Sequence, residues 1–116
     1  MKYMLLIYGD QSLEAQATPA ERDAVLQDYF TYSAELRRRG MSLGGEELGP
    51  VWTATTLRSR NGQVHVTDGP FAESKEQLGG YFILECASLD DAIDAAKLCP
   101  ALKSSAVELR PIVDNG

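Results

Sequence analysis

A short apolar run near the beginning of the chain limits the folds that it can adopt. Residues 3–8 (YMLLIY) are apolar at every position, and Gly9 and Asp10 end the run. Successive side chains of a strand point to opposite faces of its sheet, so this strand needs apolar cover on both faces. The run therefore predicts a central strand. It is too short for a transmembrane helix.

A helix is predicted over residues 19–39. Residues 18–21 (TPAE) combine an N-cap threonine, a first-turn proline and a capping-box glutamate. Arg37–Arg39 suit the negative C-terminal end of the helix dipole, and Gly40 suits the position that ends the helix. An apolar stripe at three- and four-residue spacing is expected to face the core: Val25, Leu26, Tyr29, Phe30, Ser33 and Leu36.

The remaining elements follow from shorter signals. Asn61-Gly62 is the pair that tight hairpin turns prefer, so it predicts a hairpin between the strands on either side. A second helix is expected from Ser88 to Pro100, burying Leu89, Ala92, Ile93 and Ala96. Residues 9–17 are expected to form a loop. The other predicted strands cover residues 41–43, 53–60, 63–67, 79–86 and 106–112.

This order of elements predicts an α+β fold. Without the inserted β-hairpin it is a split βαβ, or ferredoxin-like, arrangement in a single domain of residues 1–116. Two helices cover only one face of such a sheet, whereas the first strand is apolar on both. A second copy of the same sheet is the simplest cover for the other face, so we expect a homodimer.

Composition excludes several classes of function. Eleven Lys and Arg against seventeen Asp and Glu give a net charge of −6, which argues against direct binding of nucleic acid. One histidine and two distant cysteines, expected to be buried, make a metal site improbable. No phosphate loop or dinucleotide motif indicates a cofactor. No membrane segment or signal cleavage site is recognisable, so the expected location is cytoplasmic.

The segment after the second hairpin strand contains the most distinctive local pattern. In Asp68-Gly69-Pro70-Phe71, the aspartate suits an Asx-type turn, and the glycine permits backbone conformations closed to other residues. Phe71 is expected to anchor this loop in the core. Such a loop can form one wall of a pocket, or it can be a surface turn with solvated charges.

Residues 64–85 (VHVTDGPFAESKEQLGGYFILE) resemble the motif of the DGPF proteins, a branch of the YCII-related family. The opening MKYMLLIYGD, the Gly44-Gly45-Glu46 stretch and the ending from Cys99 to Pro111 are also similar to that branch, so the resemblance covers nearly the whole chain. It implies a ferredoxin-like fold that pairs as a dimeric α/β barrel. It implies little about activity.

One departure from the wider family concerns catalysis. Other YCII-related proteins have a histidine on the first helix and an aspartate before a proline after the second helix, which together are regarded as a catalytic pair. In this chain Asp28 and Tyr29 lie in the region of the first helix where those proteins have the histidine. Cys99, and not an aspartate, precedes Pro100. The pair is absent, which puts an activity inferred from the wider family in doubt.

Two hypotheses about function remain. The first is a metal-independent acid–base enzyme, or a binder of a small molecule, that uses a cleft beside the DGPF loop. Its candidate residues are Asp68, Glu46 and His65 for catalysis, with Tyr8, Tyr29, Glu73 and Gly69 for binding. The second, which the resemblance implies, is a non-catalytic accessory or regulatory module associated with sigma-factor-dependent transcription. A scaffold whose loop only seals the barrel is a further alternative.

Overall fold

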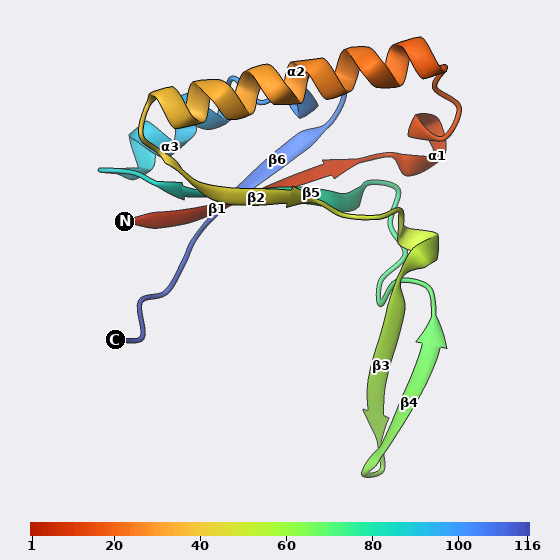
Figure 1. The fold of residues 1–116 in the computed structure, drawn as a ribbon. Coiled ribbons are helices and arrows are strands. Elements are labelled where there is room, and N and C mark those ends of the chain that lie inside the picture. Colours follow the sequence, from red (N-terminus) through yellow and green to blue (C-terminus); the bar gives the residue numbers. More distant parts are fainter.

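The computed structural model describes all 116 residues (Figure 1). In chain order the elements are β1 (Lys2–Gly9), α1 (Gln11–Glu14), α2 (Pro19–Arg38), β2 (Ser42–Glu47), the 3₁₀ turn η1 (Val51–Thr53), β3 (Thr55–Arg60), β4 (Gln63–Asp68), β5 (Gln77–Glu85), α3 (Leu89–Ala96), the 3₁₀ turn η2 (Pro100–Lys103) and β6 (Ala106–Pro111). None of the helices is long and apolar enough to cross a lipid bilayer.

Four strands form the main sheet in the order β2-β5-β1-β6, and each neighbouring pair is antiparallel. The apolar run thus lies in a central strand, as predicted, and the strand order is that of a split βαβ arrangement. Helices α2 and α3 lie together on one face of the sheet, and no element of the chain covers the other (Figure 1). The fold is α+β.

The core lies between that sheet and the two helices. Leu5 of β1, Leu84 of β5 and Leu36 of α2 are its largest fully buried side chains. Cys86 and Cys99 are buried and unpaired, as expected of small apolar side chains. The remaining core residues are Tyr3, Tyr32, Met41, Ala92, Ala95 and Ala96.

Helix α2 begins with the predicted capping box, in which Thr18 and Glu21 exchange hydrogen bonds. The predicted stripe, however, is wrong in part, because Val25, Leu26 and Phe30 are exposed. Leu26 and Phe30 lie on the flank of the helix, since each residue turns the helix by about 100°. The side that faces the core carries Tyr29 and Leu36, as predicted, and also Tyr32.

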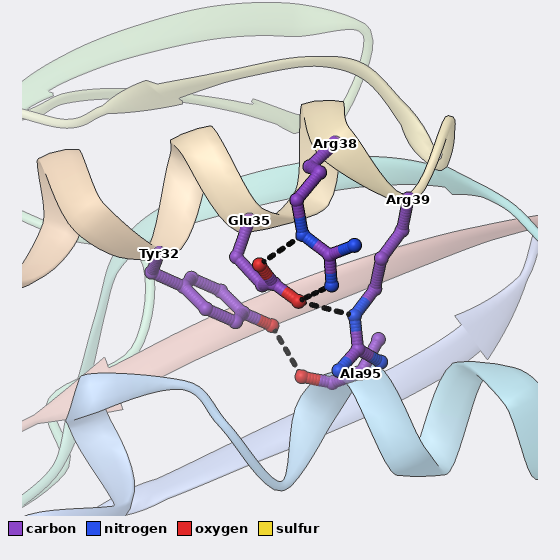
Figure 2. A network of polar contacts seen from close by, with 5 residues as sticks. All are labelled: Tyr32, Glu35, Arg38, Arg39 and Ala95. Carbon is purple, nitrogen blue, oxygen red and sulfur yellow. Dashed lines mark hydrogen bonds and ion pairs between the residues drawn. The ribbon is translucent and has the colours of Figure 1, made fainter.

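Helix α3 packs through small residues. Ala92, Ala95 and Ala96 are buried, whereas Leu89 and Ile93, which were expected in the core, are exposed. The alanines let α2 approach closely enough for the Tyr32 hydroxyl to donate a hydrogen bond of 2.8 Å to the carbonyl of Ala95. Figure 2 shows this link between the helices.

Two local predictions failed because each depended on a short signal. Residues 11–14, expected in a loop, form α1, whose N-terminus is capped by the side chain of Asp10. The pair Gly44-Gly45, expected to end a strand, lies within the edge strand β2. There a Cβ atom on Gly45 would collide with the backbone of β5, so only glycine fits this close approach.

Strands β3 and β4 form a separate two-stranded sheet, here called the arm. Asn61 and Gly62 adopt positive φ angles of 51° and 78° at its tip, as the Asn-Gly signal predicts. The arm projects from the body on the side opposite the helices (Figure 1). None of the residues of its two strands is buried.

Candidate functional site

A cavity of about 480 Å³ lies where the arm joins the body. The loop of residues 68–74, here called the DGPF loop, forms one wall, and η1 forms the other. The lining residues are Val51, Trp52, Asp68, Gly69, Pro70, Ala72, Glu73, Ser74 and Gln77. The motif that stood out in the sequence therefore borders a hollow.

Backbone hydrogen bonds hold the DGPF loop to the base of the arm. The amide of Gly69 donates to the carbonyl of Ala54 at 2.8 Å, and the hydroxyl of Thr56 donates to the carbonyl of Gly69 at 2.7 Å. Gly69 has a φ of +100°, a conformation that other residues rarely adopt. This glycine therefore fixes the path of the chain directly after Asp68.

Two glutamine side chains connect the walls of the cavity to α1. The Gln77 side chain donates to the carbonyl of Ser74 at 2.6 Å and accepts from the amide of Gln11 at 3.0 Å. The buried Gln11 side chain in turn accepts from the amide of Val51 at 2.8 Å. These bonds connect α1, the DGPF loop and η1, so both walls are anchored to the same short helix.

Acidic and aromatic groups border the cavity. Neither Asp68 nor Glu73 takes part in a salt bridge, and both are exposed to solvent. Trp52, the only tryptophan of the chain, is 60% exposed on the opposite wall. Carboxylates and an accessible indole ring both attract cations, the first by charge and the second through its π-system.

His65 does not join this site. It pairs with Arg58 across the arm, on the face opposite Val64 and Val66, whereas Asp68 lies on the same face as those valines. The expected anchoring of Phe71 in the core is also wrong, because this side chain is 71% exposed. Its ring lies 4.7 Å from the guanidinium of Arg58, which gives it a cation–π contact with the arm.

Glu46 and Tyr8 lie on the main sheet, on the face that the helices leave open. Glu46 of β2 is opposite Tyr81 of β5. The Tyr8 hydroxyl donates a 3.3 Å hydrogen bond to Glu108, and burial together with that carboxylate raises the pKa of Tyr8. These residues belong to the open sheet face, and neither lines the cavity of the DGPF loop.

The side chain of Tyr29 lies on the core-facing side of α2, next to Cys99. Burial, followed by the neighbouring thiol and the carboxylates of Glu14 and Glu47, raises the pKa of Tyr29. Burial likewise raises the pKa of Cys99 above that of a free thiol. Both groups are therefore neutral near pH 7, and a buried neutral thiol is a poor nucleophile. Tyr29 and Cys99 stand near the positions of the catalytic pair of the wider family. They lie close together here, but neither side chain is activated.

The structure thus brings together Asp68, Gly69 and Glu73, and it separates them from the other predicted site residues. Sequence reasoning missed Trp52, Gln11 and Gln77 at this place. A lone tryptophan in the polar stretch after Pro50 is a signal that could have pointed to the first. Nowhere do three or more His, Cys, Asp or Glu side chains gather in a way that could hold a metal ion.

Comparison with known proteins gives two findings. The family model of the YCII-related domain matches residues 1–115. An uncharacterized protein of Rhizobium meliloti (strain 1021), R00369, is 38% identical over 114 residues, which cover 97% of this chain and 92% of that protein. Both matches extend over the sheet, the helices and the DGPF loop. The chain belongs to the YCII-related family.

Proposed function

We propose that this protein binds a small organic cation in the cavity between the DGPF loop and η1, and that it does so as a homodimer. The observation that carries the proposal is the convergence of two unpaired carboxylates and an exposed indole on one anchored cavity. A cavity of about 480 Å³ lies within the range that holds small ligands, roughly 300–1,000 Å³.

The sign of the ligand follows from electrostatics. No Lys or Arg lines the cavity, and the whole chain has a net charge of −6. An anion would meet Asp68 and Glu73 without a compensating charge, whereas an ammonium group would be attracted by both carboxylates. Trp52 adds a flat apolar surface, so a cation that also carries an aromatic or aliphatic group fits the lining best.

Binding is better supported than catalysis. Acid–base catalysis needs a donor and an acceptor within hydrogen-bond reach of the same substrate atoms. The histidine lies on the other face of the arm from Asp68, and Glu46 lies on the sheet. Among the lining residues, Asp68 and Glu73 are the only titratable groups. Binding of a cation needs only these two carboxylates, whereas acid–base catalysis would also need a separate general acid.

The homodimer is supported by the open sheet face. Its apolar side chains are Met4, Leu6, Tyr81 and Ile83, which no element of the same chain covers. The chain exposes 8172 Å², whereas a compact monomer of this mass exposes about 6,200 Å². The excess is roughly 2,000 Å², and each subunit of an obligate dimer buries about 1,000–2,500 Å². A face-to-face dimer is also what the resemblance to dimeric α/β barrels implies.

Fluorescence of the single tryptophan tests the ligand proposal. Benzylamine, benzyl alcohol and benzoate present the same ring with a positive, zero and negative charge. We expect benzylamine to shift the emission of Trp52 at the lowest concentration, and the substitution Asp68→Asn to weaken that response about tenfold or more. Glu46→Gln removes a carboxylate outside the cavity and is the matched control.

The outcome is decisive in either direction. A preference for benzoate, or an unchanged response in Asp68→Asn, would contradict a cation site at the DGPF loop. If no compound changes the emission of Trp52, a role through protein contacts, such as an accessory module of transcription, becomes the better hypothesis.

Light scattering tests the dimer separately. The native chain is expected at about twice its 12.7 kDa. Leu6→Glu puts a charge in the middle of the open sheet face and is expected to give a monomer. Leu89→Glu, an exposed leucine on the helix side, should remain dimeric. A monomeric native protein would refute the dimer without affecting the ligand proposal.

A further inference from the structure

The arm has one apolar face that nothing in its own chain covers. Leu57 is opposite Val66, and Val64 is the next residue of β4 on that face. These three side chains are 63%, 64% and 65% exposed, in the order Leu57, Val66 and Val64. The other face carries polar pairs such as Arg58 and His65. The arm is thus amphipathic in the manner of a strand pair that has one buried face.

The arm also lies away from the body. The radius of gyration is 16.2 Å, whereas a compact domain of this length has about 13 Å. A two-stranded hairpin alone is marginally stable in water. This hairpin nevertheless has a regular register over six residue pairs, from Thr55 with Asp68 to Arg60 with Gln63. A hairpin with such an apolar face is stabilised when another surface covers that face.

The direction of the arm indicates which surface that is. It points to the side opposite the helices, the same side as the open sheet face (Figure 1). Packed sheets lie about 10 Å apart, and a strand of six residues is about 20 Å long. An arm of that length is long enough to reach past the sheet of a second copy seated on the open face.

Charge favours the same partner. Residues 55–67 contain Arg58 and Arg60 and no acidic residue, whereas the whole chain has a net charge of −6. The arm is therefore the cationic part of an acidic protein. A second copy offers apolar cover to the face of Leu57, Val64 and Val66, and its negative charge attracts the arginines of the other face.

We propose that the arm of each subunit packs its Leu57, Val64 and Val66 face against the other subunit, so that two exchanged arms clasp the dimer. This inference rests on the dimer proposed above, and it adds a second contact to the one between the sheets. The partner is a second copy of this chain.

Isotope-filtered NMR on a dimer of one ¹³C-labelled and one unlabelled subunit distinguishes the two contacts. Methyl groups of Met4, Leu6 and Ile83 report on the sheet contact, and those of Leu57, Val64 and Val66 report on the arm. We expect contacts between subunits from both sets. Contacts from the sheet set alone would overturn the clasp and leave the dimer intact, and contacts from neither set would overturn both.

A matched pair of variants measures the contribution of the arm. Val66→Glu places a charge on its apolar face, and Thr67→Glu places the same charge on the neighbouring position of its polar face. By sedimentation, Val66→Glu should raise the dimer dissociation constant about tenfold or more, and Thr67→Glu by less than about threefold. Equal effects of the two variants, or no effect of either, would refute an apolar contact made by the arm.

Discussion

The body and the arm of this molecule obey different rules of stability. In the body, strands pair in a four-stranded sheet and bury their apolar side chains under α2 and α3. In the arm, two strands pair as regularly but bury nothing. A correct register therefore does not by itself stabilise a strand pair, since the pair also needs a surface against which it can exclude water.

The largest expected effect tests this contrast directly. Leu5 is 0% exposed, so Leu5→Ala should lower the free energy of unfolding by about 2–5 kcal/mol through lost burial and the cavity left behind. Val64→Ala removes an apolar side chain of the arm. In protein diluted until it is monomeric, it should cost about 0.5 kcal/mol or less. Urea unfolding measures both, and equal losses would show that the arm is part of the cooperative core.

A smaller effect is expected from two glycines with the same type of backbone conformation. Gly62 at the tip of the arm has a φ of +78°, and Gly40 after α2 has a φ of +69°. A Cβ atom would meet no neighbour at either position, so Gly→Ala costs only backbone strain, about 1 kcal/mol.

The location of that strain distinguishes the two regions. Gly40→Ala should lower the melting temperature of the whole protein, since α2 is part of the body. Gly62→Ala should increase hydrogen exchange of the β3 and β4 amides and leave the melting temperature of the monomer unchanged. A global loss from Gly62→Ala would mean that arm and body unfold together.

The smallest effect concerns charge on the surface of the body. Hydrogen bonds from Arg38 and Arg39 lower the pKa of Glu35 to about 2 (Figure 2). A carboxyl group whose pKa is lower in the folded state stabilises the fold above its unfolded pKa of 4.5, and this contribution is lost as the pH falls toward 2.

Glu35→Gln should therefore lower the melting temperature slightly at pH 6, and the difference from the native protein should shrink toward pH 3. Glu14 gives the opposite sign, because burial and the nearby carboxylates of Asp10 and Glu47 raise its pKa. For Glu14→Gln we expect a small gain in stability at pH 7 that disappears near pH 4. A pH-independent effect of either substitution would show that packing, and not charge, is responsible.

The elements predicted best are those with a strong local signal. The apolar run at residues 3–8, the capping box at residues 18–21 and Asn61-Gly62 each specify a structure through neighbouring residues, and each prediction is confirmed. The four-residue helix α1 has no periodicity to detect. The exposed flank of α2 was mistaken for core because apolar spacing does not show how much surface lies opposite a helix.

The candidate site was predicted in part for the same reason. The DGPF loop is a continuous segment, so local turn chemistry marked it as either a pocket wall or a surface turn, and turn chemistry alone does not choose between the two. The connection of the cavity walls to α1 depends on Gln11 and Gln77, which are far apart in the sequence and meet only in the folded chain. The departure of the arm from the body likewise depends on the packing of the whole molecule. No pattern within residues 55–68 predicts that the arm projects from the body.

The glycine-containing edge strand β2 has a consequence for how this protein can assemble. An unpaired strand edge is a template on which further chains can add, one after another, into a fibre. Here the edge is interrupted by the bulge between Ser42 and Gly44, and it ends in the adjacent acidic pair Glu46 and Glu47. The two like charges repel the same edge of a second copy, and the irregular backbone cannot form a regular hydrogen-bond ladder with an incoming strand. Growth of a fibre by strand addition at β2 is therefore discouraged.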